Sequence, residues 1–147
     1  MGIVYDELKK FKSNGGTVGW RIKKHAEVVE KHLNPNENVI YGFYAQRNDS
    51  LTDIFSTCAV VLTNKRILIG QKRLIFGYHL IAITPDMFND LTVHTGLIWG
   101  KVYIDTVKEV VKLSNISKNS VTEIETQITE YMMKEKRKYA QKEKSIN

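Results

Sequence analysis

The sequence contains few of the features that mark secreted, metal-binding or membrane-spanning proteins. It has one cysteine in 147 residues, so an internal disulfide is impossible, and it has no paired-cysteine motif for a metal ion. The longest purely apolar run, Cys58–Leu62, falls far short of the about 18 residues that a membrane-spanning helix needs. The first residues, MGIVYDELKKFK, have acids and lysines where a signal peptide needs an apolar stretch. We therefore expect a cytoplasmic protein.

Catalytic motifs are missing as well. Gly15-Gly16 is not followed by the Gly-Lys-Ser/Thr pattern of a phosphate-binding loop, and no zinc-protease pattern occurs. His79 and His94 are isolated residues in predicted strands, where histidines are typically surface or partly buried polar groups. Cys58 lies in an apolar strand and is expected to be a core residue. The sequence therefore predicts no enzyme activity, no cofactor, no metal and no small-molecule substrate.

Length and composition are those of a single globular domain. A chain of this length can bury a sizeable core without disulfides or a metal. Hydrophobic residues make up 42% of the chain and charged residues 26%, which is close to the average for soluble globular proteins. Gross disorder is therefore not expected.

The net charge of +6 is concentrated near the C-terminus. Between Lys134 and Lys144 there are six basic residues and two acidic ones, so this segment carries +4 and the rest of the chain is close to neutral. A solvated, fraying helix end accounts for such a segment. The alternative is contact with an anionic membrane, to which each nearby Lys or Arg contributes about 1 kcal/mol.

Two helices are predicted before the first strand. Residues 1–12 have apolar side chains at helical spacing, and residues 13–16, SNGG, interrupt them. A second helix is predicted from Trp20 to Leu33, because a proline soon afterwards cannot continue it. His25 and His32 lie two turns apart on this helix, too far apart to bind one metal ion by themselves. We expect both on a solvated helix face.

The middle of the chain predicts a run of antiparallel strands joined by short polar turns. Branched and aromatic residues place these strands at Val39–Gln46, Phe55–Thr63, Arg66–Gly70, Leu74–Thr84, Met87–Thr95, Ile98–Ile104 and Glu109–Leu113. The turns are too short for the crossovers that a parallel sheet requires.

Two of these strands show a regular alternation of side chains. In Met87–Thr95 the pattern places Met87 and Leu91 on one side and Phe88 on the other. In the next strand Ile98 shares a predicted buried face with Gly100, Val102 and Ile104.

A helix is predicted after the last strand, starting at Ser120. Ser120 and Glu123 form a capping box, which satisfies free amide groups at a helix start. Val121, Ile124, Ile128 and Tyr131 then recur at helical spacing and form one apolar stripe. About seven antiparallel strands and one amphipathic helix predict an α+β fold, mainly β, in which a strongly curved sheet or partly open barrel is capped by the helix.

The hairpin LTNKRILI at Leu62–Ile69, the strand GLIWGKVYI at Gly96–Ile104 and the closing helix together resemble the bacterial pleckstrin-homology-like domains. The resemblance covers about Asn36 to Met133. It implies a seven-stranded antiparallel bent barrel or sandwich capped by a C-terminal amphipathic helix. We therefore expect an N-terminal helical extension at 1–35, the PH-like domain at 36–133, and a basic helical or disordered tail at 134–147.

The resemblance does not imply phosphoinositide binding. Eukaryotic relatives that bind these lipids use clustered basic residues in the first two strands and the loop between them. Here that loop, Arg47–Asp53, has one base and two acids, and a phosphate needs several converging donors. The eukaryotic relatives also carry a tryptophan in the capping helix, where this chain has Tyr131 and Met132.

The leading hypothesis is a non-catalytic binding or assembly module that holds a protein partner or a second copy of itself, because open sheet edges pair readily with other strands. The first alternative is peripheral binding to anionic membrane lipids through the basic tail. The second is nucleic-acid binding by the same tail. It is less favoured, because the chain has no strand face on which aromatic and basic residues alternate. The basic residues predicted as possible contacts with an anionic surface are Lys65, Arg66, Lys72, Arg73, Lys134, Lys136, Arg137 and Lys138.

Overall fold

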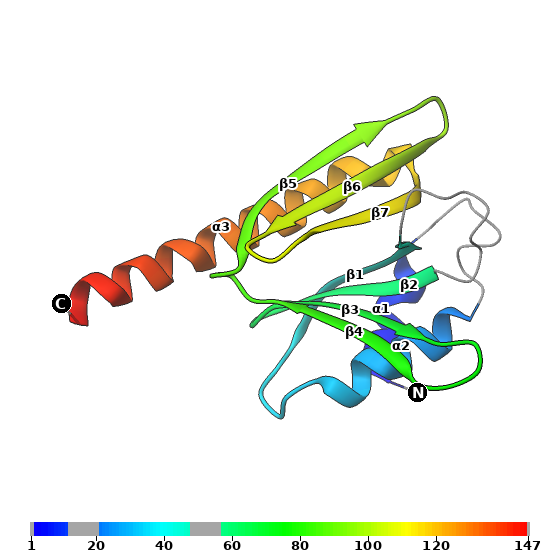
Figure 1. Ribbon diagram of the computed structural model, residues 1–147, viewed down its shortest axis with the longest axis horizontal. Helices are drawn as coiled ribbons and strands as arrows, with labels where there is room; N and C mark the ends of the chain where they lie inside the picture. The colour runs from blue at the N-terminus through cyan, green and yellow to red at the C-terminus, as the bar shows by residue number, and fades with distance from the viewer. Residues whose placement is uncertain (1, 12–20, 48–56, 147) are drawn as a thin grey trace.

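A computed structural model describes residues 2–11, 21–47 and 57–146 (Figure 1). The predicted helix break at 13–16, the start of the second helix at Trp20, most of the Arg47–Asp53 loop, and Phe55 at the start of the second strand lie outside the described residues.

The described residues contain three helices and seven strands. In chain order they are α1 (Ile3–Lys10), α2 (Ile22–His32), β1 (Val39–Gln46), β2 (Thr57–Thr63), β3 (Ile67–Lys72), β4 (Tyr78–Ile83), β5 (Phe88–Thr95), β6 (Trp99–Thr106), β7 (Val110–Ser117) and α3 (Lys118–Ile146). This order confirms the predicted fold class.

The strands form one antiparallel sheet with the order β4-β3-β2-β1-β7-β6-β5. The sheet bends where β1 pairs with β7. In this antiparallel pairing, Gln46 lies opposite Ser114. The two parts on either side of this bend curl toward each other into a half-barrel (Figure 1). The strands at its two ends, β4 and β5, are consecutive in the chain.

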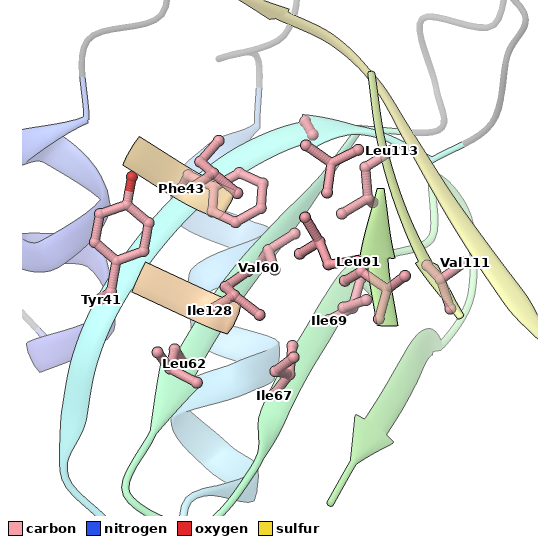
Figure 2. Close-up of a cluster of buried hydrophobic side chains, with 14 of the residues drawn as sticks. Tyr41, Phe43, Val60, Leu62, Ile67, Ile69, Leu91, Val111, Leu113 and Ile128 are labelled. Carbon is pink, nitrogen blue, oxygen red and sulfur yellow. The ribbon is translucent and has the colours of Figure 1, made fainter. Parts of the chain in front are cut away.

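The main core fills the inside of this half-barrel. Side chains from both parts of the sheet meet there, including Phe43, Val60 and Leu113 (Figure 2). The long helix α3 closes the core with Val121, Ile124, Ile128 and Met132, which recur at helical spacing and are all buried. The predicted apolar stripe is therefore correct in Val121, Ile124 and Ile128. Tyr131 is only partly buried, although it packs against the core, and Met132 is the fourth buried member.

A second apolar layer covers the outer face of the first four strands. Val4 and Leu8 of α1 and Ala26 and Val29 of α2 pack against Ala59, Val61 and Leu68. Gly70 permits the close approach of α2, since a Cβ there would lie 2.6 Å from Cγ2 of Val29. The N-terminal helices are thus packed on the sheet, and every residue of β2 is buried because the strand is covered on both faces.

Two details of the strand predictions are wrong. Phe88 and Leu91 are both buried, because the pairing of β5 with β6 shifts register between Phe88 and Asp90 and the alternation breaks there. Ile98 is exposed in the turn before β6, so the buried face of that strand begins at Gly100.

Candidate functional site

The eight basic residues predicted as contacts lie in two separate regions. Lys65 and Arg66 are in the turn between β2 and β3, and the four basic residues of Lys134–Lys138 lie on α3. Lys72 and Arg73 lie at the opposite end of β3, where the chain turns toward β4 (Figure 1). The structure brings Lys65 of the first group close to Lys138 of the second, and it leaves Lys72 and Arg73 apart.

A groove of about 160 Å³ lies between the β2–β3 turn and α3. Lys65, Lys138 and Lys142 line it, together with Glu135 and Tyr139. Nζ of Lys138 lies 3.2 Å from Oε1 of Glu135, so this pair offsets one of the positive charges. We call this site the basic groove. It has a net positive lining, but its lysines are exposed and each ion pair formed there contributes little.

Arg66 is held by the protein itself. Its Nε and Nη2 donate to the two carboxylate oxygens of Glu37 at 3.0 and 3.1 Å, and Nη2 also donates to the carbonyl oxygen of His32 at 2.8 Å. Burial alone would raise the pKa of Glu37, but hydrogen bonds from Arg66, Thr63 and the backbone of Asn34 hold it below its usual value. Arg66 therefore ties the end of α2 to the β2–β3 turn.

The predicted contacts on α3 differ in their surroundings. Lys136 donates from Nζ to the carbonyl oxygen of Phe88 at 2.7 Å, which ties α3 to the start of β5. Lys134, Arg137 and Lys138 are exposed. The exposed basic side chains thus begin where the apolar stripe of α3 ends.

A group of exposed apolar side chains lies in the turn between β3 and β4. Leu74, Ile75 and Phe76 are 56%, 77% and 80% exposed, and we call them the apolar tip. The sequence pattern predicts these three residues as the start of a strand, but β4 begins only at Tyr78. Gly77, with a φ of +70°, supplies the left-handed conformation that closes the turn.

The base of this turn is fixed to the rest of the protein. The N–H of Arg73 donates to the carbonyl oxygen of Gly77 at 3.0 Å, and Nη2 of Arg21 donates to the carbonyl oxygen of Arg73 at 3.1 Å. The hydroxyl of Tyr78 lies 3.1 Å from Nε2 of His32, and the two rings are in contact. The apolar tip therefore projects from a well-anchored base.

The prediction that His25 lies on a solvated helix face is wrong. His25 is buried against the sheet, where its Nδ1 accepts the N–H of Lys72 at 2.9 Å. Nε2 therefore carries the proton and donates to Oγ1 of Thr57 at 2.9 Å. Burial and the nearby charge of Arg21 lower the pKa of His25 to about 4. This histidine fastens α2 to β2 and β3. Cys58 is fully buried, as predicted.

A cavity of about 350 Å³ lies where α1, β1 and the start of α3 meet. Glu7, Lys10, Tyr41, Ser120 and Glu123 contribute to its lining. Lys10 and Glu7 pair with each other at 3.0 Å, and burial raises the pKa of the Tyr41 hydroxyl further above its already high usual value.

No helix within residues 2–11, 21–47 and 57–146 is long and apolar enough to cross a membrane. Among the same residues, no cluster of three or more His, Cys, Asp or Glu side chains has the arrangement needed to hold a metal ion.

The half-barrel of seven antiparallel strands, closed by a C-terminal helix, defines a PH-like domain. Residues 33–130 match the bacterial PH domain family, which is more than half of the chain. The protein therefore belongs to this family, as its resemblance to the bacterial pleckstrin-homology-like domains implies. Domains of this kind commonly mediate binding and are generally non-catalytic.

Comparison with solved structures gives a match to the crystal structure of a pleckstrin homology domain from Shewanella amazonensis SB2B. The two chains are 18% identical, the match covers 85% of this chain and 93% of the other, and the TM-score is 0.44. A comparison with curated proteins found no match.

Proposed function

We propose that this chain is a non-catalytic binding module that holds another polypeptide strand, and in the first place a second copy of itself, along an open edge of its sheet. The observation that carries the proposal is the strand order, in which β4 and β5 occupy the two ends of the sheet. An end strand has backbone N–H and C=O groups on its outer side that can pair with a further strand.

The end strand β5 is the better candidate of the two beyond Phe88, whose carbonyl oxygen already accepts a hydrogen bond from Lys136 of α3. Its exposed side chains are all polar: Asn89, Asp90, Thr92, His94 and Thr95. In β4 the side chains from His79 to Ala82 are half-buried, so that edge is partly screened. A second copy that pairs through β5 would extend the sheet across two molecules. In this symmetric arrangement, β5 of one copy pairs with β5 of the other.

The oligomeric state of the purified full chain tests this proposal. Size-exclusion chromatography with light scattering, carried out over a series of protein concentrations, should give a mass that rises above the chain mass of 16.9 kDa. A mass of one chain at every concentration would overturn the self-association.

A second candidate function is peripheral attachment to an anionic membrane through α3. The observation that favours it is the basic groove, in which Lys65 approaches Lys138 and Lys142. Replacement of Lys138 and Lys142 by Gln should weaken sedimentation with vesicles that contain phosphatidylglycerol by roughly fivefold for each cation removed. Unchanged sedimentation of this variant would exclude the groove as a membrane contact.

A further inference from the structure

The cavity between α1, β1 and the start of α3 has the size and the lining of a site for a small molecule. Its volume is about 350 Å³, and Phe11 and Tyr41 bring aromatic rings to its wall. Gly42 also lines it, and a Cβ at that position would lie 3.3 Å from Cγ of Glu7, so the glycine lets Glu7 come close to β1. We call this space the Tyr41 cavity.

The hydroxyl of Tyr41 is buried and has no hydrogen-bond partner within residues 2–11, 21–47 and 57–146. Tyr41 is only 9% exposed, and in Figure 2 its hydroxyl points away from Leu62. Burial, followed by the nearby carboxylates of Glu123 and Glu7, raises the pKa of this hydroxyl, so it stays neutral at neutral pH. Buried side-chain oxygen atoms nearly always have a partner, and this one is free to accept a hydrogen bond from a ligand.

The charges around the cavity favour a cation. Glu7 and Glu123 contribute −2 and Lys10 contributes +1, so the lining has a net charge of −1. Lys10 pairs with Glu7 at 3.0 Å, and its side chain is 74% exposed and extends toward solvent. Glu123 forms no ion pair with any residue in the described part of the chain. Its carboxylate is therefore the one that a positively charged group can reach without displacing Lys10.

The first turns of α3 supply a second hydroxyl. The sequence predicts a capping box at Ser120 and Glu123, but α3 begins at Lys118, so these two residues lie inside the helix. Both of them line the Tyr41 cavity. Together with Tyr41 they provide one carboxylate and two hydroxyls, and each of these three groups can accept one N–H of a primary ammonium.

We propose that the Tyr41 cavity binds a small organic molecule that carries a primary ammonium group. The ammonium donates to the carboxylate of Glu123 and to the hydroxyls of Ser120 and Tyr41, and the apolar part of the molecule packs against Phe11. A hydrogen bond from an ammonium to a carboxylate is stronger than one between neutral groups, so the charge of the ligand matters. This inference gives the binding module a ligand at a place away from the β5 edge, and it does not rest on self-association.

The first test is a titration of the full chain, followed in two-dimensional amide NMR spectra at neutral pH. Phenethylamine and butylamine carry a primary ammonium, whereas phenethyl alcohol has the ring of the first amine without its charge. Both amines should cause saturable shifts of the amide signals of Gly42 and Ser120. Phenethyl alcohol should bind at least roughly tenfold more weakly than phenethylamine.

The second test measures phenethylamine binding to variants of the lining. Glu123→Gln should weaken it roughly tenfold, because a charged hydrogen bond is lost, and Tyr41→Phe should weaken it roughly fivefold. The matched controls are Glu130→Gln and Tyr139→Phe, which change an exposed acid and an exposed tyrosine of α3 outside the cavity. Both controls should bind like the wild type.

The third test separates a ligand contact from a structural role of the Tyr41 hydroxyl. Because this hydroxyl has no partner in the described part of the chain, Tyr41→Phe should unfold, in the absence of amine, at the same temperature as the wild type or at a higher one. The same variant should gain less thermal stability than the wild type when phenethylamine is added.

Four outcomes would overturn the proposal. The first is the absence of saturable shifts with either amine at millimolar concentrations. The second is equal binding of phenethyl alcohol and phenethylamine, and the third is equal binding of phenethylamine by Glu123→Gln and the wild type. The fourth is a lower unfolding temperature of Tyr41→Phe without amine, which would show that the hydroxyl already has a partner in the protein.

Discussion

The carboxylate of Glu37 accepts two hydrogen bonds from the guanidinium group of Arg66, from Nε at 3.0 Å and from Nη2 at 3.1 Å. The side chain of Glu37 is fully buried and that of Arg66 is 19% exposed. This ion pair joins the loop before β1 to the β2–β3 turn. Because Arg66 is paired with Glu37, it holds the β2–β3 turn in place, whereas Lys65 beside it is exposed.

Replacement of Glu37 by Gln should destabilise the fold. The guanidinium of Arg66 would lose its charged partner in a mostly buried place, and the free energy of unfolding should fall by about 2–3 kcal/mol. Urea denaturation at neutral pH measures this change. The matched variant Glu109→Gln alters an exposed acid in another turn and should change stability by less than about 0.5 kcal/mol. Equal stabilities for Glu37→Gln and wild type would contradict the structural role of the pair.

Stability should also fall on mild acidification, because of His25. The pKa of its buried ring is about 4, below the usual 6.5, so the unfolded chain takes up a proton at a pH where the folded protein does not. The stabilisation is complete above about pH 6.5 and is lost as the pH falls toward 4, by roughly 3 kcal/mol in all.

Urea denaturation at about pH 7 and about pH 5 checks this dependence. His25→Gln should show a smaller difference between the two pH values than the wild type, although it is less stable at both. His94→Gln, which changes an exposed histidine, should keep the wild-type difference. An identical pH dependence in all three proteins would mean that His25 is not responsible.

The docking of α3 depends on a glycine in β6. A Cβ at position 100 would overlap Cγ2 of Val121 in the first turns of α3. Gly100→Ala should therefore cost about 1–3 kcal/mol through overpacking. Thr95→Ala, at the exposed residue paired with Gly100 across the hairpin, should cost less than about 0.5 kcal/mol. Thermal or urea unfolding of the two variants makes the comparison, and a tolerated Gly100→Ala would show that α3 can move away from β6.

Much of the fold could be predicted because the local patterns agree with the tertiary structure. A strand is predicted at Val39–Gln46, and β1 has these bounds in the structure. The spacing of Val121, Ile124 and Ile128 identifies the core face of α3. The break in alternation after Phe88 could not be predicted, because a bulge depends on how two strands pair and the sequence of either strand alone does not reveal it.

The candidate sites were harder to predict, for two physical reasons. Leu74, Ile75 and Phe76 have the composition of a buried strand, and only the early turn at Gly77 separates them from β4. His25 directly follows two lysines in the sequence, and its burial results from the way α2 packs on β2 and β3. The first feature depends on the conformation of one turn, and the second on contacts between residues that are far apart in the chain.

The most direct test of the proposed function compares two added charges. Thr92→Lys places a lysine on the exposed face of β5, where charge discourages strand pairing, and Thr126→Lys adds the same charge to the exposed side of α3. Light scattering at high protein concentration should then show a single-chain mass for Thr92→Lys and an unchanged, larger mass for Thr126→Lys and the wild type. The same mass for all three proteins would contradict pairing through β5.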